Sequence, residues 1–214
     1  MNRMNFIKPA IPETSLRRLL YYMRCLRTYK KDGVKTVLSD NIAKKCGVKS
    51  SVVRKDLSYF GEFGVRGKGY DVDELCHKLE TMLDSLGPIN TIVIGAGKLG
   101  TAIINHSKEN FKTNIIAAFD KNINKTGKNI NGVPVYFLDK LEDIIKENSI
   151  KIAVIAIPPC EVQPVVDRLV SVGIKSILSL ALLPINVPEG VEVSFFDVLS
   201  EVEYLFLKLN FKES

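Results

Sequence analysis

A glycine-rich segment in the middle of the sequence has the residue types and spacing of a phosphate-binding turn. Gly95, Gly97 and Gly100 form a Gly-x-Gly-x-x-Gly pattern after the β-branched run at 91–94, and helical spacing follows. The first glycine permits a tight turn, the second lets the backbone approach a pyrophosphate, and the third lets helix and strand pack closely. The helix N-terminus then attracts phosphate through its free N–H groups. The remaining residues of this predicted dinucleotide site are Ala96, Lys98 and Leu99.

An acidic residue occupies the position at which such a site binds the ribose. A second apolar run, residues 114–119, ends at Asp120, about 20 residues beyond Gly100. A carboxylate there accepts a hydrogen bond from a ribose 2′-hydroxyl and favours NAD over its 2′-phosphorylated form. Asp120 and the adjacent Lys121 are therefore predicted cofactor-binding residues. The alternative is a surface acid that follows a buried strand.

Residues 39–60 have the spacing of a helix-turn-helix. Ser39 and Ser50 are both suitable N-caps, and Gly47 stands between the two short apolar patterns. In this motif the second helix enters the major groove of DNA. The residues expected to reach base edges or phosphates are Ser51, Arg54, Lys55 and Ser58. The alternative is a small helical domain with another role.

The next segment and the charge distribution favour a DNA-binding domain. Residues 61–70 are rich in glycine and are typical of a β-hairpin, which after a recognition helix forms a wing, with Arg66 and Lys68 at its tip. Residues 1–70 carry 16 Lys/Arg and 5 Asp/Glu, a net charge of +11, whereas the remainder carries 14 and 19, a net charge of −5. A basic front part indicates a polyanionic partner, most simply nucleic acid.

The remaining pattern predicts an α/β fold in two domains. A helix N-capped by Thr14 or Ser15 precedes the helix-turn-helix, and a connecting helix runs from Asp71 to the boundary at 86–88. Beyond it, strands and helices alternate, as in a doubly wound parallel sheet. Strands are expected at 91–95, 114–119, 133–137, 151–157, 176–180 and 191–195, and helices at 98–109, 139–147 and 161–172. We therefore expect a winged-helix domain at 1–86, a Rossmann domain at 87–195 and a C-terminal helix at 196–214.

Two loops and the last helix complete the expected site. A cofactor lies across the carboxyl ends of the strands, so the loops 157–160 and 180–184 should line its nicotinamide side, through Ile157, Pro158 and Ala181. The apolar residues of the last helix cover more than one core-facing stripe. Such a helix buries itself on its own domain or on a partner subunit, and a helix-turn-helix protein normally works as a dimer.

The composition bears on the cellular location of the protein and on whether it binds a metal or a membrane. The longest largely apolar run, 177–185, is too short to span a bilayer and contains a proline, and no apolar signal segment follows the N-terminus. The four cysteines are scattered without a Cys-x-x-Cys pair, which favours buried thiols in a reducing cytosol over a metal site. We therefore expect a cytoplasmic protein with no metal and no membrane partner.

The sequence resembles a known family in both parts. The run 53–64, which continues through Arg66-Gly67 and Gly69-Tyr70, is similar to the winged-helix signature of the Rex redox-sensing transcriptional repressors, and 95–100 followed by Asp120 resembles their nucleotide site. The resemblance covers essentially the whole chain. It implies a homodimeric bacterial repressor with a domain-swapped C-terminal helix. NADH would close the dimer and release palindromic operator DNA, whereas NAD+ would compete with NADH and permit DNA binding.

The resemblance also implies roles for three further residues. Arg24 matches an arginine at the interface between the two domains, and Asp197 matches an aspartate at the base of the exchanged helix that pairs differently in the two states. His106 stands where the family often has a tyrosine that senses the nicotinamide. After the fifth strand the chain has Ala181-Leu182 where the family favours Ala-Pro.

Two other functions fit parts of the sequence. An NAD-dependent dehydrogenase with a basic appendage would need a substrate pocket and a placed proton donor, for which His106, His77 and Cys160 are the candidates. Residues 1–85 form the predicted DNA-binding domain. No separate substrate-binding domain remains, so we expect that the protein is not an enzyme. A CoA-binding module is a near relative in fold, but Asp120 and the complete glycine pattern favour a dinucleotide.

Overall fold

The computed structural model describes residues 11–64, 67–107 and 113–211. Its contacts divide the chain into two compact units, Met1–Gly87 and Pro88–Ser214. Each unit is described by itself below.

The first unit is a small helical domain with one pair of short strands. Its helices are α1 (Glu13–Lys31), α2 (Ser39–Cys46), α3 (Ser50–Ser58) and α4 (Val72–Asp84), and β1 (Thr36–Val37) pairs antiparallel with β2 (Tyr70–Asp71). Apolar residues at helical spacing meet in its core, which includes Tyr22, Leu26, Ile42, Val53, Leu57, Leu75 and Leu79. The short α2 and α3 pack on each other and on α1, so the predicted helix-turn-helix is present.

The predicted N-caps of three helices were wrong. Pro12 is the N-cap of α1, ahead of Thr14 and Ser15, because its fixed φ suits a helix start and its missing N–H costs nothing there. Leu38 and Lys49 are the N-caps of α2 and α3, so Ser39 and Ser50 are their first helical residues. The start of α4 agrees with the prediction, since Asp71 caps it by accepting the Glu74 N–H at 2.8 Å.

The described part of the glycine-rich segment contains one strand, β2, and its partner is the strand that precedes α2. With only two residues, β1 is too short to be predicted from a sequence pattern. Gly64 and Gly69 both have φ near the left-handed region, and a Cβ on Gly64 would lie 2.5 Å from the Gly69 carbonyl oxygen. Arg66, one of the predicted wing residues, lies outside the described residues.

The second unit has the predicted doubly wound sheet, in the order β5-β6-β4-β3-β7-β8-β9. Six strands are parallel: β3 (Ile89–Ile94), β4 (Thr113–Asp120), β6 (Val133–Phe137), β7 (Ile152–Ile155), β8 (Ser176–Ser179) and β9 (Glu192–Phe195). Numbered along the chain, they follow the Rossmann order 3-2-1-4-5-6. The short edge strand β5 (Asn129–Ile130) runs antiparallel to β6 and was not predicted.

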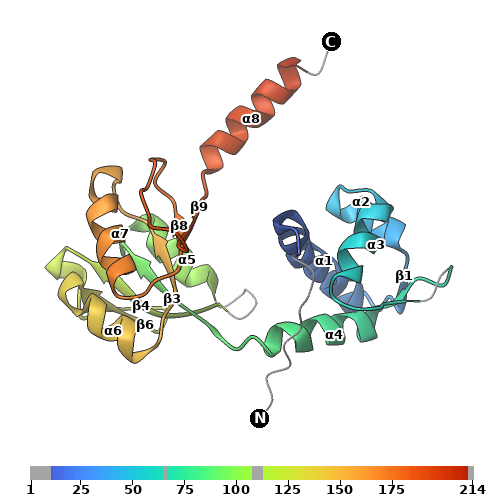
Figure 1. The fold of residues 1–214 in the computed structure, drawn as a ribbon, viewed down its shortest axis with the longest axis horizontal. Helices are drawn as coiled ribbons and strands as arrows, with labels where there is room; N and C mark the ends of the chain where they lie inside the picture. The colour runs from blue at the N-terminus through green and yellow to red at the C-terminus, as the bar shows by residue number, and fades with distance from the viewer. Residues whose placement is uncertain (1–10, 65–66, 108–112, 212–214) are drawn as a thin grey trace. The chain divides into compact units, whose positions relative to one another are not determined.

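Helices cover both faces of this sheet (Figure 1). On one face, α5 (Lys98–Ser107) buries Ile104 against Val93 and Ala118. On the other, α6 (Leu141–Glu147) and α7 (Val162–Ser171) bury their apolar faces against Ile92 and Phe119. Short 3-10 helices occur at η1 (Ile123–Lys125), η2 (Leu138–Lys140) and η3 (Pro159–Glu161). Because alternate residues of β3 belong to the two clusters, the sheet is buried on both sides, as a parallel sheet requires.

The last helix, α8 (Val198–Phe211), extends away from the sheet (Figure 1), and none of its residues is buried. Leu199 is 72% exposed and Leu209 is 74% exposed. Within the described chain, no helix has the length and apolar character that crossing a membrane requires.

Candidate nucleotide site and DNA-binding surface

The glycine loop joins β3 to α5, and its three glycines have different surroundings. Gly95 has φ +100°, and a Cβ there would lie 2.4 Å from the Ala156 carbonyl oxygen. A Cβ on Gly100 would lie 1.9 Å from the Gly95 carbonyl oxygen. A Cβ on Gly97 would have no heavy atom within 4 Å, apart from its chain neighbours. The packing therefore requires glycine at 95 and 100. Gly97 faces open space, where we expect the protein backbone to approach the pyrophosphate of the ligand.

Asp120, at the end of β4, is tied directly to this loop. It is only 9% exposed, and its Oδ2 accepts the Ala96 N–H at 3.0 Å and the Lys125 ammonium at 2.8 Å. Its Oδ1 accepts the Asn122 N–H at 2.8 Å. Burial alone would raise the pKa of Asp120, but Lys125 and these amide groups outweigh it and hold the pKa below its usual value. An ionised carboxylate oxygen accepts more than one hydrogen bond, so Oδ1 retains capacity for a ribose hydroxyl.

Lys121, the other residue predicted at the end of β4, contacts a residue from a different loop. Its Nζ lies 2.5 Å from Glu161 Oε1. Glu161 ends η3, which follows β7, so this ion pair joins the loops after the two strands that flank β3. The hydrogen bond with Glu161 raises the pKa of Lys121. Sequence reasoning missed Glu161 and Lys125, because the contacts follow from strand order and loop shape.

Most of the other predicted cofactor residues lie at the same carboxyl edge, at the start of α5 or after β7 and β8, whereas His106 lies in the last turn of α5, next to Asn105, whose carbonyl oxygen accepts a hydrogen bond from Asn131 before the amino end of β6. Lys98 and Leu99 are exposed at the start of α5, Ile157 is half-buried and Pro158 is exposed after β7. Ala181 is buried in the core, and its backbone bonds to the Ser179 hydroxyl. The exposed His106 has Nδ1 2.9 Å from the Ala102 carbonyl oxygen of its own helix. Their predicted contacts with nicotinamide stay predictions.

The cysteines differ from the expectation of uniformly buried thiols. Cys25 and Cys76 are buried, Cys46 is half-buried, and Cys160 is exposed beside Glu161 in η3. Burial raises the pKa of the Cys25 thiol to about 11. Across the described ranges, no group of three or more His, Cys, Asp or Glu side chains is placed to hold a metal ion.

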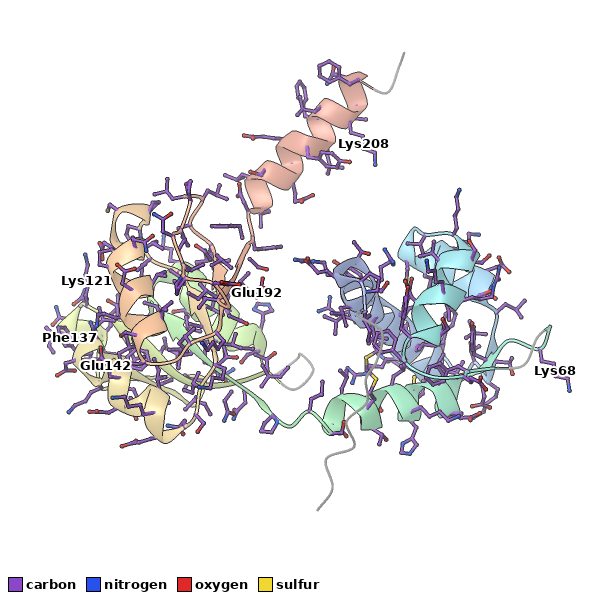
Figure 2. All side chains as sticks on the ribbon, viewed as in Figure 1. Lys68, Lys121, Phe137, Glu142, Glu192 and Lys208 are labelled. Carbon is purple, nitrogen blue, oxygen red and sulfur yellow. The ribbon has the colours of Figure 1, made fainter. Side chains whose placement is uncertain are left out.

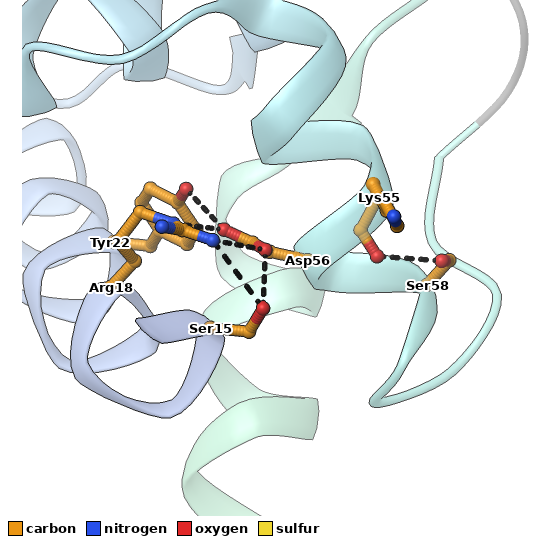
Figure 3. Close-up of polar contacts among 6 residues, drawn as sticks. All are labelled: Ser15, Arg18, Tyr22, Lys55, Asp56 and Ser58. Atoms are coloured by element: carbon orange, nitrogen blue, oxygen red, sulfur yellow. Dashed lines mark hydrogen bonds and ion pairs between the residues drawn. The ribbon is translucent and has the colours of Figure 1, made fainter. Parts of the chain in front are cut away.

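The predicted DNA-contacting residues of α3 share one exposed face. Ser51, Arg54, Lys55 and Ser58 are all exposed, whereas Val53, Asp56 and Leu57 are buried against the other helices. Arg54 Nη1 donates to the Ser39 Oγ at 2.8 Å, which fixes the arginine against α2. The Ser58 hydroxyl donates to the Lys55 carbonyl oxygen at 2.7 Å (Figure 3). Lys68 is exposed and projects from the segment between α3 and α4 (Figure 2).

A buried polar cluster, which the sequence analysis missed, sets the position of α3. The Asp56 carboxylate accepts hydrogen bonds from the Ser15 hydroxyl at 2.7 Å, the Tyr22 hydroxyl at 2.7 Å and Arg18 Nε at 2.6 Å (Figure 3). The three donors lie on α1 at spacings of three and four residues, hence on one helix face. The sequence signal for this cluster was the acidic residue between Val53 and Leu57, two residues with buried side chains. A buried charge needs hydrogen-bonding or charged partners.

The two residues given a switching role have defined positions within their own units. Arg24 is exposed on α1 and lines a cavity of about 410 Å³ with Tyr21 and Lys45. Asp197 caps α8, since its carboxylate accepts the N–H groups of Leu199 at 2.9 Å and Ser200 at 3.0 Å and also the Ser200 hydroxyl. The Ser200 hydroxyl and these amides hold the pKa of Asp197 below its usual value. Its predicted second pairing stays a prediction.

Comparison with known proteins identifies relatives of the whole chain. Residues 10–58 match the family model described as a putative DNA-binding protein N-terminus, and residues 87–183 match the CoA binding domain. The redox-sensing transcriptional repressor Rex of Desulforamulus reducens is 38% identical over 206 residues, which cover 95% of this chain and 97% of that protein.

Solved structures agree with this relationship. The crystal structure of RSP in complex with β-NAD+ and operator DNA matches with a TM-score of 0.85 and 36% identity over 96% of this chain and 95% of RSP. RSP in complex with β-NADH matches with a TM-score of 0.83 and 35% identity over 96% and 97%. The predicted winged-helix and Rossmann architecture is thereby confirmed. The Desulforamulus relative is named a repressor, and RSP is described as a Rex-family repressor. The chain belongs to the Rex family of redox-sensing transcriptional repressors.

Proposed function

We propose that this chain works as a homodimer that represses transcription from a palindromic operator and leaves the DNA when it binds NADH. The observation that carries the proposal is the pairing, in one chain, of an exposed polar face on α3 with a glycine loop tied to Asp120. RSP, its structural relative, has been crystallised with NAD+ and operator DNA and also with NADH.

In the proposed complex, α3 enters the major groove. Arg54 and Lys55 supply cationic contacts, and the bond from Arg54 to Ser39 limits the side-chain entropy lost on binding. Lys68 contacts the backbone or the minor groove from the wing. Both charge and exposure support these roles, since α3 has no acid on this face.

The nucleotide lies across the carboxyl ends of β3, β4 and β7. The glycine loop and the N-terminus of α5 bind the pyrophosphate, and Asp120 accepts the ribose hydroxyl. These contacts are common to NADH and NAD+, so they give affinity without discrimination. Preference for NADH arises at the nicotinamide, because an apolar surface penalises the cationic oxidised ring. Ile157 and the exposed Leu182 and Leu183 supply apolar surface in the two predicted loops.

The C-terminal helix supplies the dimer contact. Exposed apolar side chains on α8 include Leu199, Leu205, Phe206, Leu209 and Phe211, and such a surface is covered in a stable protein. Exchange of α8 between two subunits buries it and creates the two-fold symmetry of a palindromic operator. A repressor of bacterial DNA acts in the cytoplasm, which is where we place this protein.

The test is DNA binding to a palindromic fragment, titrated separately with NADH and NAD+ at fixed salt. We expect NADH to dissociate the complex and NAD+ to leave it intact. DNA binding that ignores both nucleotides would show that the Rossmann unit serves another ligand. Sedimentation of the free protein tests the dimer, and deletion of 198–214 should give monomers with weakened DNA binding.

A further inference from the structure

Two lysines lie beside Asp120, the acidic residue that is expected to bind the ribose hydroxyl. Lys121 directly follows Asp120, and Lys125 contacts it. A free cation at this place is the feature with which Rossmann domains accept the 2′-phosphate of NADP(H). The presence of two lysines is therefore at odds with a site that prefers NAD(H), unless both charges are already engaged.

Each of the two lysines is paired with one acid. Lys125 Nζ lies 2.8 Å from Asp120 Oδ2, and Lys121 Nζ lies 2.5 Å from Glu161 Oε1. Glu161 comes from the loop after β7, and β3 lies between β7 and β4, so the second pair passes across the carboxyl end of β3. Two cations and two carboxylates thus give no net charge next to the predicted ribose position.

We propose that Glu161 is a specificity-determining residue, which holds Lys121 in an ion pair and thereby denies it to a 2′-phosphate. The inference rests on the proposed nucleotide site. Its direction follows from charge: without Glu161, Lys121 is a free cation beside the 2′ position and attracts the phosphate of NADPH, whereas NADH has a neutral hydroxyl there. Asp120 continues to repel the phosphate, so Glu161 modifies the preference and Asp120 keeps its main role.

The exposure of the pair separates this role from a structural one. The Lys121 side chain is 65% exposed and that of Glu161 is 31% exposed. Exposed ion pairs contribute little to folding stability, so removal of the Glu161 charge should change ligand preference and leave the thermal stability of the chain nearly unchanged.

The experiment measures NADH and NADPH affinity by the fluorescence of the bound nucleotide, which is readily observed because the chain contains no tryptophan. In the full-length Glu161→Gln variant we expect NADPH to bind about fivefold more tightly relative to NADH at low salt, with the gain reduced at high salt. The Glu161→Gln/Lys121→Gln double variant should lose the gain. Glu192→Gln is the matched control, because Glu192 is exposed at the amino end of β9, the opposite edge of the sheet (Figure 2).

The outcomes separate this inference from the proposed function. An unchanged NADPH-to-NADH affinity ratio in a Glu161→Gln variant that still binds NADH would overturn the role of Glu161 alone. A gain that persists in the double variant, or that Glu192→Gln reproduces, would also overturn it. If the wild-type chain bound no NADH, the proposed function and this inference would both fail. Glu161→Ser provides the same comparison if the glutamine variant folds poorly.

Discussion

The Tyr22 hydroxyl in α1 donates a hydrogen bond of 2.7 Å to the carboxylate of Asp56 in α3, and the same carboxylate receives the Arg18 guanidinium. Asp56 lies one residue after Lys55 and two after Arg54, on the opposite side of the helix from the expected DNA contacts. The exposed face of α3 is therefore oriented by a charge that is only 2% exposed. We therefore assign to Asp56 the role of positioning α3, since its charge lies on the side of the helix away from the expected DNA contacts.

Replacement of Asp56 by alanine should strongly destabilise the first unit. The change leaves Arg18 and Tyr22 without their acceptor, and loss of one partner of a buried pair costs roughly 3 kcal/mol. Hydrogen–deuterium exchange followed on peptides of α1 and α3 measures this loss separately from the Rossmann unit. Glu13→Gln is the control, since Glu13 pairs with Arg17 at the surface, 2.8 Å apart, and its loss should change protection little. Equal effects of the two changes would contradict the role assigned to Asp56.

Acid should weaken the first unit through the same residue. Burial would raise the pKa of Asp56, but hydrogen bonds from Arg18, Tyr22 and Ser15 outweigh it, so the folded pKa lies below the ordinary 3.8. A lowered folded pKa means that this contribution to stability is complete above the unfolded pKa and is lost as pH falls through the folded pKa. Protection of α1 and α3 should therefore fall steeply below about pH 4 in the wild type. In Asp56→Asn the protection should be lower at neutral pH and its fall in acid shallower. Parallel pH profiles would exclude Asp56 as the source.

The sequence predicted the fold and the glycine loop because both depend on local patterns. The β-branched runs that alternate with helical patterns predicted a doubly wound sheet, and the glycine spacing and the acid at 120 predicted the nucleotide site, without any contact information. The N-caps at Thr14 or Ser15, Ser39 and Ser50 failed for a related reason: serine suits several positions near a helix start, and Ser15 is used by Asp56 instead.

The contacts between distant segments were not predictable in the same way. Lys121 meets Glu161 across 40 residues, and Arg18 meets Asp56 across 38. Such pairs depend on which loops a folded sheet or helix packing brings together, and single-sequence patterns carry no register between them. Cys160 was expected to be a buried thiol and is exposed, because η3 lies at the carboxyl edge of the sheet.

The glycines at 97 and 100 should respond differently to alanine. A Cβ at Gly100 would overlap the Gly95 carbonyl oxygen, so Gly100→Ala must displace backbone and should unfold or distort the loop between β3 and α5. A Cβ at Gly97 enters open space, so Gly97→Ala should fold with nearly unchanged thermal stability. If the pyrophosphate approaches Gly97, that variant should nevertheless lose about tenfold or more in affinity for both NADH and NAD+. Normal nucleotide binding by a folded Gly97→Ala protein would refute the proposed approach.

Two substitutions of Asp197 should separate helix capping from switching. Asparagine retains an oxygen that can accept the Leu199 or Ser200 N–H, so Asp197→Asn should preserve α8, whereas Asp197→Ala loses the cap and weakens the start of the helix. The family role requires a charge that pairs differently in the DNA-bound and NADH-bound states, and such a difference is what allows a ligand to shift the equilibrium.

The decisive comparison is therefore the NADH concentration that releases half of the operator DNA from the wild type and each Asp197 variant, at equal NADH affinity. If the charge acts in the switch, Asp197→Asn should bind NADH and DNA normally but require much more NADH for release, and Asp197→Ala should behave likewise. If Asp197 only caps α8, the asparagine variant should release DNA as the wild type does, and only the alanine variant should be impaired. The second result would remove Asp197 from the switch and leave Arg24 as the residue to test, by Arg24→Gln in the same assay.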